Sequence, residues 1–181
     1  MRQSAGVSFT IRRCLKESVI LPESISSIGE RAFHNCSSLT HLEIPEGVVS
    51  IGDHAFYYCE NLKSVSIPST VTYVGYNAFY GCGNIGDMTV SQVLCGPFES
   101  EEYSYYGLSD IGCGGVTNLV VHSGVTNIGE AVFSSLYNLQ SVTIPEGVVN
   151  IGDSAFSCCC SLLSVTLPST VANIGADAFS S

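Results

Sequence analysis

Basic residues are scarce in this 181-residue chain, and their scarcity argues against binding to polyanions such as nucleic acids. Only six Lys and Arg stand against 16 Asp and Glu, and neither basic type occurs after Lys63. Binding to a nucleic-acid backbone or to an anionic membrane surface depends on clustered Lys and Arg side chains. We therefore expect no nucleic-acid partner and no attraction to anionic membranes.

Long hydrophobic runs are missing too. No apolar segment approaches the roughly 18 residues that a helix needs to cross a bilayer, so no membrane insertion is expected. The first residues are basic but lack the hydrophobic centre of a secretion signal, so a signal is either absent or already removed. We interpret residues 1–13 as a leading segment, which is vector-derived, a cut edge or a frayed first strand.

Catalytic and cofactor-binding motifs are also lacking. There is no Gly-x-Ser-x-Gly and no Walker motif, and Gly81–Gly86 fits Gly-x-Gly-x-x-Gly only formally, because it precedes a predicted strand instead of following one. No two of the four histidines have the four-residue spacing of a helical metal site; they are His34, His41, His54 and His122. We expect no enzymatic activity, no cofactor and no metal site.

The chain has instead a strict internal repeat. An Ile-Gly or Val-Gly pair returns at every twenty-third position in two groups of three, at Ile28, Ile51 and Val74 and at Ile128, Ile151 and Ile174. The step from Val74 to Ile128 is longer than two such periods by eight positions, so we expect an insertion near residues 91–104. A repeated array of short units predicts one elongated domain over residues 14–181.

A longer similarity connects the two groups. The segment from Ile44 to Asp53 returns with one change at residues 144–153. Duplication of a block of four repeats together with the insertion explains this similarity. Independent similarity of neighbouring repeats is the alternative.

Each repeat combines two periodicities. Val65 and Ile67 alternate with polar residues as in a strand, and Pro68 ends it because proline has no amide hydrogen to donate. Ala55, Phe56 and Cys59 lie at helical spacing, which predicts a short helical return. The glycines of the Ile-Gly pairs are interpreted as turn residues between the two legs.

These repeats resemble the BspA-like class of leucine-rich repeat, whose units read Ile-Gly-x-x-Ala-Phe-x-x-Cys-x-x-Leu-x-x-Val-x-Ile-Pro-x-x-Val. The resemblance covers about residues 19–181 and is weakest over 91–115. It implies a curved parallel sheet and a surface or secreted protein that binds host proteins or other cells. The predicted fold is α/β, a leucine-rich-repeat solenoid of about seven coils: a right-handed βα superhelix with the sheet on its concave face.

Nine cysteines raise the question of disulfides and metals. Five of them share one position of the repeat, which predicts a column on one flank: Cys36, Cys59, Cys82, Cys113 and Cys159. A column of small buried thiols is the favoured interpretation, with disulfides between coils or a metal site as alternatives. Cys158 and Cys160 lie outside this position and are expected to be more exposed, and Cys14 and Cys95 lie outside it as well.

Outward strand positions carry mostly short polar side chains, as expected of soluble strands or of a surface that binds protein or glycan. The candidate binding residues on this face are His41, Glu43, Ser64, Ser66, Thr143 and Thr166.

The insertion interleaves aromatic and acidic side chains, which favours either a solvated bulge or a loop that binds a basic partner. Its candidate binding residues are Phe98, Glu99, Glu101, Glu102, Tyr103, Tyr105 and Tyr106.

The function expected from these patterns is non-enzymatic recognition of a protein or glycan ligand at the cell surface or after secretion. The alternative is a structural element that associates end to end, since the chain stops in mid-repeat at Ser181 without a polar cap.

Overall fold

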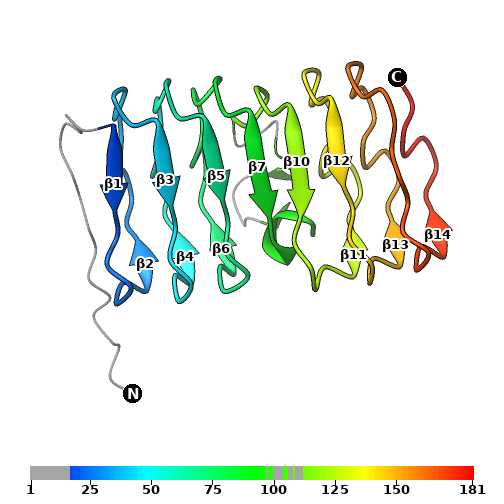
Figure 1. The fold of residues 1–181 in the computed structure, drawn as a ribbon, viewed down its shortest axis with the longest axis horizontal. Helices are drawn as coiled ribbons and strands as arrows, with labels where there is room; N and C mark the ends of the chain where they lie inside the picture. Colours follow the sequence, from blue (N-terminus) through cyan, green and yellow to red (C-terminus); the bar gives the residue numbers. More distant parts are fainter. Residues whose placement is uncertain (1–16, 97, 100–103, 106–107, 109–111) are drawn as a thin grey trace.

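The chain forms one elongated solenoid in which each coil lies beside the next (Figure 1). The computed structural model describes residues 17–96, 98–99, 104–105, 108 and 112–181. A coil runs through a strand of the main sheet, a turn, a shorter second strand and a return leg that leads to the next main strand. The fold is a parallel-sheet solenoid of about six turns.

The main sheet contains six parallel strands in the order β1-β3-β5-β7-β10-β12. They are β1 (Ser18–Ile20), β3 (His41–Glu43), β5 (Ser64–Ser66), β7 (Asp87–Val90), β10 (Asn118–Val121) and β12 (Ser141–Thr143). The seventh coil adds only an isolated bridge between Thr143 and Thr166. Partners in the sheet are one repeat period apart, as Val65 is from Leu42, except where β7 meets β10 and Asp87 pairs with Asn118. The additional residues of this longer step therefore lie between β7 and β10.

Short second strands make two further parallel sheets. One contains β2 (Ser27–Ile28), β4 (Ser50–Ile51) and β6 (Tyr73–Val74), and the other contains β11 (Asn127–Ile128), β13 (Asn150–Ile151) and β14 (Asn173–Ile174). In the second of these, asparagine side chains form a chain of hydrogen bonds. Asn150 Nδ2 donates to Asn127 Oδ1 at 2.6 Å, and Asn173 Nδ2 donates to Asn150 Oδ1 at 2.7 Å.

The predicted helical return is wrong, and the backbone shows why. Across residues 17–96 and 112–181 the only helix is the short 3-10 helix η1 (Gln92–Leu94), and the return legs are series of turns. In the second coil, His54 and Tyr58 have positive φ angles near 55°. Their amides, with that of Phe56, donate to carbonyl oxygens of the next coil at 2.7 to 2.8 Å. These amides therefore join neighbouring coils instead of closing helical turns.

The glycines of the Ile-Gly pairs are required by close approach between coils, not by a turn conformation. Gly52 does not have a positive φ angle, but a Cβ at this position would lie 2.7 Å from the amide nitrogen of Glu30. The equivalent Gly152 would place a Cβ 2.7 Å from the amide nitrogen of Glu130. A side chain at either position would push two backbones apart.

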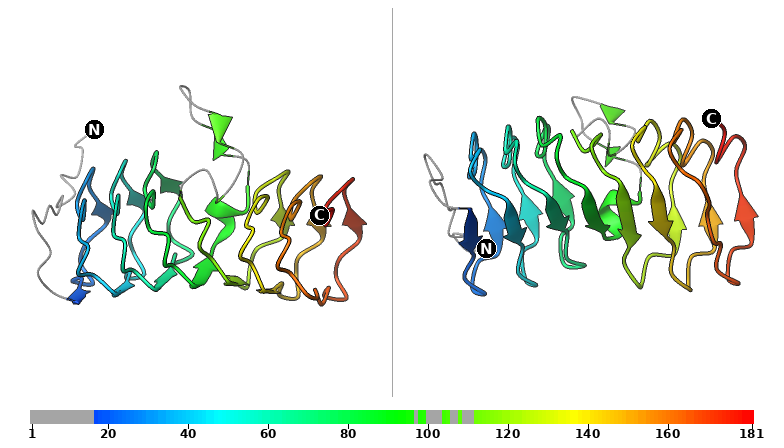
Figure 2. Two further views of the ribbon diagram at one scale, coloured as in Figure 1. Left: turned by 90° about the horizontal axis from the view of Figure 1, so that it is seen from above. Right: turned by 45° about the horizontal axis from the view of Figure 1, so that its top comes forward.

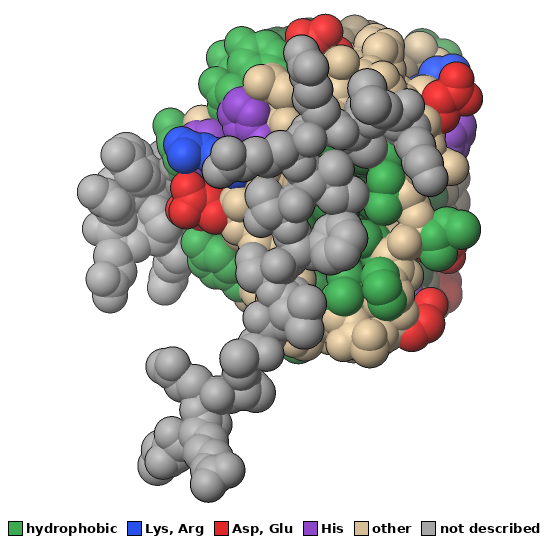
Figure 3. Space-filling view, turned by 90° about the vertical axis from the view of Figure 1, so that its left-hand side faces the viewer, with side chains coloured by type: hydrophobic (Ala, Val, Ile, Leu, Met, Phe, Trp, Pro, Cys, Tyr) green, Lys and Arg blue, Asp and Glu red, His purple; other side chains and the backbone are tan. Residues whose placement is uncertain are grey.

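The core is one continuous cluster of buried side chains through all coils. Its largest members are phenylalanines at one position of the repeat: the rings of Phe33 and Phe56 stack with centroids 5.1 Å apart, and those of Phe56 and Phe79 do the same. Seen from the N-terminal end, hydrophobic side chains show within the cross-section and also at its edge, and acidic side chains lie toward the rim (Figure 3). Stacking of identical positions thus builds the core, as expected for repeats that cannot bury their apolar side alone.

The insertion interrupts the series of second strands. Helix η1 takes the place between β6 and β11, and its Gln92 side chain reaches the next coil: Nε2 donates to the Asn127 carbonyl at 3.1 Å, and Oε1 accepts from the Thr126 amide at 3.2 Å. After η1, β8 (Phe98–Glu99) and β9 (Ser104–Tyr105) pair in antiparallel fashion. Figure 2 shows these two strands projecting on the side away from the main sheet.

Candidate functional site

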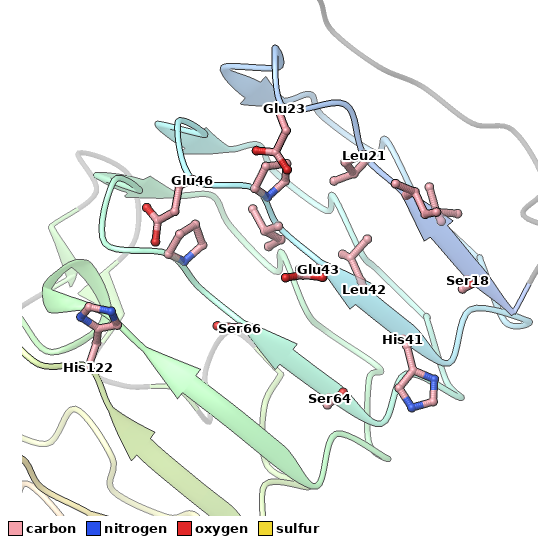
Figure 4. A pocket seen from close by; sticks show the side chains of 15 residues that line it. Ser18, Leu21, Glu23, His41, Leu42, Glu43, Glu46, Ser64, Ser66 and His122 are labelled. Carbon is pink, nitrogen blue, oxygen red and sulfur yellow. The ribbon is translucent and has the colours of Figure 1, made fainter.

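The candidate site is a shallow groove at the N-terminal end of the main sheet, with a volume of about 620 Å³. Outward side chains of β1, β3 and β5 line it, and four of the predicted residues are among them: His41, Glu43, Ser64 and Ser66 (Figure 4). Strand alternation puts these side chains outside, because Leu42 and Val65 between them point into the core. The structure therefore brings these four residues together on one surface.

The groove also contains side chains that the strand pattern did not indicate. Glu23 and Glu46 lie in the turns that follow β1 and β3, and together with Glu43 they place three carboxylates around the groove (Figure 4). His122, which follows β10, lines its far side. Glu23 and Glu46 are one repeat period apart, so their shared repeat position was the signal that could have identified them.

Thr143 and Thr166 lie on the same sheet face but not in this groove. They line a separate hollow of about 350 Å³ near the C-terminal end, together with Glu146. There the carboxylate of Glu146 accepts hydrogen bonds from the amide and the hydroxyl of Ser169 at 3.2 and 3.1 Å. The predicted residues of the sheet face therefore form two groups at opposite ends.

The insertion does not join either group. Because β8 and β9 project away from the main sheet, the backbone of Phe98, Glu99 and Tyr105 lies on another side of the solenoid (Figure 2). The remaining predicted residues of the insertion lie outside the described residues: Glu101, Glu102, Tyr103 and Tyr106. A ligand held by the groove and the insertion at once would have to reach around the solenoid.

The predicted cysteine column is confirmed as a series of buried thiols that form no disulfide with another described cysteine. The Sγ of Cys59 donates to the Phe33 carbonyl at 3.1 Å, and that of Cys82 donates to the Phe56 carbonyl at 3.0 Å. Cys158 and Cys160 are exposed, as expected, whereas Cys95 is also buried. In the described part of the chain, no three His, Cys, Asp or Glu side chains gather closely enough to hold a metal ion.

The family model of the BspA type leucine rich repeat region matches residues 8–111 and 111–181, in six copies. The chain belongs to this family. Its return legs and cysteine column are thus features of a BspA-type leucine-rich repeat array. Within the described residues, no helix has the length and hydrophobicity that a membrane crossing requires.

Solved structures of bacterial leucine-rich repeat proteins are similar to this BspA-type array. A leucine-rich repeat protein from Eubacterium ventriosum is 25% identical, with a TM-score of 0.65 over 91% of this chain. The T. pallidum leucine rich repeat protein is 27% identical, with a TM-score of 0.61. The match covers 88% of this chain and 73% of the T. pallidum protein. A protein from Faecalibacterium prausnitzii described as a leucine rich cell surface protein is 28% identical, with a TM-score of 0.57 over 94% of the chain.

The chain spans 42% of the Eubacterium protein and 47% of the Faecalibacterium protein. A search of curated protein sequences gave no match.

The thiols of this BspA-type array should divide sharply by reactivity. Burial raises the pKa of Cys95 and of Cys113 to about 12, and only the thiolate reacts, so buried thiols remain unreactive near neutral pH. In a Cys14→Ser variant, a colorimetric thiol reagent at neutral pH should titrate Cys158 and Cys160 within minutes. It should reach all eight described cysteines only after denaturation.

A Cys158→Ser/Cys160→Ser version of that variant is the matched control and should show no fast phase. Rapid reaction of four or more thiols in the native protein, or fewer than five free thiols after denaturation, would contradict the buried column.

Proposed function

We propose that this chain is a non-enzymatic recognition module of a surface or secreted protein, and that its main-sheet face binds a protein or glycan ligand. The observation that carries the proposal is the groove, in which exposed polar side chains of three strands and three carboxylates face solvent together (Figure 4). The cell-surface description of the Faecalibacterium relative supports the location.

The charge of the groove favours a basic ligand. Glu23, Glu43 and Glu46 are all exposed, and the chain carries a formal net charge of −10. Complementary charge speeds encounter with a basic partner and disfavours acidic ones. The insertion is a second candidate contact for the same ligand class, on a different side of the solenoid.

Reversing charge in the groove should show whether a ligand binds to the groove or to the insertion. Wild type is first screened against arrays of extracellular proteins and glycans, and each ligand found is measured by biolayer interferometry. A Glu43→Lys/Ser66→Lys variant should bind a basic ligand at least tenfold more weakly, because both changes place positive charge where it docks.

Glu130→Lys is the matched control, since Glu130 is exposed on a return leg away from the groove. A Tyr103→Ser/Tyr105→Ser/Tyr106→Ser variant reports on the insertion. Binding that survives the groove variant unchanged for every ligand would rule out the sheet face as the recognition surface.

End-to-end association is a second candidate function, favoured by apolar side chains on the last coil. Leu163 is 90% exposed and Ile174 is 50% exposed, and a hollow of about 360 Å³ beside Phe156 and Phe179 is lined largely by apolar residues. Sedimentation velocity at several concentrations tests this, and a strictly monomeric chain would exclude it.

A further inference from the structure

A second distinctive surface lies on the return legs of the first three coils. His34, Tyr57 and Tyr80 occupy one repeat position, and their rings form a stacked column. The centroids of His34 and Tyr57 are 5.1 Å apart with planes at 11°, and those of Tyr57 and Tyr80 are 5.2 Å apart with planes at 18°. This column follows the long axis of the solenoid, because its members are one coil apart.

Further rings pack against the column and widen it. Tyr58 meets Tyr57 and Tyr80 edge to face, with centroids 4.7 and 5.9 Å away. Its ring lies against Gly81, where a Cβ would come within 2.8 Å of it. His54 contacts Tyr57 at 5.1 Å and Tyr76 at 5.3 Å. We call this set the aromatic surface: His34, His54, Tyr57, Tyr58, Tyr76 and Tyr80.

The surface is open to solvent. Tyr58 is 39% exposed and Tyr80 is 44% exposed, so the rings do not serve as core. Beyond Tyr80, Gly112 of the next coil lies so close to its backbone that a Cβ there would clash. The coil that carries the insertion therefore packs directly against the backbone of Tyr80.

The second half of the chain shows that coil stacking does not require these rings. At the equivalent positions of the last three coils, the column is occupied by Ser134, Ser157 and Ser180. The backbone there is bonded as in the first half: the Asn35 amide donates to the Tyr57 carbonyl at 2.8 Å, and the Ser135 amide donates to the Ser157 carbonyl at 2.8 Å. The coils thus stack with the same backbone hydrogen bonds when serine replaces the aromatic rings. The rings are therefore not needed for coil stacking, and their presence calls for another explanation.

Acidic groups accompany the rings. Asp53 Oδ1 accepts a hydrogen bond from the Tyr73 hydroxyl at 3.3 Å and one from the Tyr76 amide at 2.9 Å. Glu60 is exposed at the end of the return leg that carries Tyr57 and Tyr58. In the first of these legs, the side chain of Arg31 is paired with that of Glu30 at 3.5 Å. Electron-rich rings and carboxylates together complement a positive charge.

We propose that the aromatic surface is a second binding site, which takes an arginine-rich or lysine-rich segment of a partner protein. Guanidinium groups stack on tyrosine rings and donate to phenol and carboxylate oxygens, so one cationic segment satisfies both features of the surface. Tyrosines are also enriched at protein interfaces, because they contribute large contact areas with little loss of conformational freedom. This site is separate from the sheet-face groove and does not depend on it.

The test exchanges the column for its serine counterpart. A fluorescent nine-arginine peptide is titrated into wild type and into a His34→Ser/Tyr57→Ser/Tyr80→Ser variant, and binding is followed by anisotropy. We expect the variant to bind at least tenfold more weakly, although its formal net charge is unchanged. Wild type should also prefer the arginine peptide to a nine-lysine peptide, because guanidinium stacks on rings better than ammonium does.

Two controls make the result decisive. Tyr137→Ser, which changes an exposed tyrosine outside the aromatic surface, should keep most of the affinity. Circular dichroism and thermal unfolding confirm that the serine variant is folded. Equal binding by wild type and the serine variant would overturn the proposal, as would no binding of the arginine peptide. Binding of a neutral oligosaccharide such as chitohexaose, instead of the arginine peptide, would also overturn the proposal.

Discussion

Replacing Phe56 with alanine is expected to lower the free energy of unfolding by about 4 kcal/mol. The side chain is fully buried and stacks on both neighbouring coils, with Phe33 on one side and Phe79 on the other. Its removal leaves a cavity and breaks two ring contacts, so two coil interfaces are weakened at once. Urea denaturation followed by circular dichroism measures the loss.

Phe179→Ala is the matched control for this change. Phe179 occupies the same repeat position but is only partly buried in this chain and stacks on Phe156 alone, at 5.2 Å. We expect a loss of only about 1 kcal/mol. Equal losses for the two variants would show that coil interfaces do not determine the stability of the array.

Gly52→Ala should cost about 3 kcal/mol, although it adds a single methyl group. That methyl would lie 2.7 Å from the Glu30 nitrogen and 2.8 Å from the Gly29 carbonyl carbon. Both atoms belong to the backbone of the preceding coil, so relief requires the coils to separate and the bond from the Gly52 amide to the Ile28 carbonyl (2.8 Å) to lengthen. The same denaturation experiment measures the effect.

Gly83→Ala provides the comparison. Gly83 also lacks a positive φ angle, but nothing lies within 4 Å of an added Cβ. Alanine there should leave stability unchanged or raise it by about 0.5 kcal/mol through a less flexible unfolded chain. If Gly52→Ala were as harmless as Gly83→Ala, close approach between coils would not explain the glycine of each repeat.

The repeat period predicts most of the fold because stacking gives equivalent residues equivalent environments. The regular spacing of the column cysteines predicts their burial, and the eight inserted positions predict the longer step from Asp87 to Asn118. Alternation around Val65 likewise predicts which side of each strand faces solvent. These features follow from local pattern and from the need to bury one face of every coil.

The return legs could not be predicted in the same way. The spacing of Ala55, Phe56 and Cys59 suits a helix, and all three side chains are indeed buried. What decides against a helix is a set of hydrogen bonds to the next coil, made possible by positive φ angles at His54 and Tyr58. Such bonds depend on a neighbour that the local pattern does not describe.

Local sequence pattern predicts only the strand residues of the candidate site, and not those in its turns. Strand alternation marks His41, Glu43, Ser64 and Ser66 as outward positions. Glu23 and Glu46 lie in turns, where no period-two pattern operates, and they join the groove through the packing of coils. The rings of the aromatic surface occupy return legs whose residue spacing suits a helix, and a helix would not stack equivalent rings of neighbouring coils in this way.

At the insertion coil, hydrogen bonds of the Gln92 side chain take the place of second-strand pairing. The main sheet runs without a break from β5 through β7 to β10, but the second strands stop at β6 and resume at β11. Between them, the Gln92 side chain and a bond from the Gly129 amide to the Cys95 carbonyl (2.6 Å) connect η1 to the next coil. The two halves are therefore joined by a continuous main sheet on one side, and on the other side by side-chain and irregular backbone bonds where the regular second strands are interrupted.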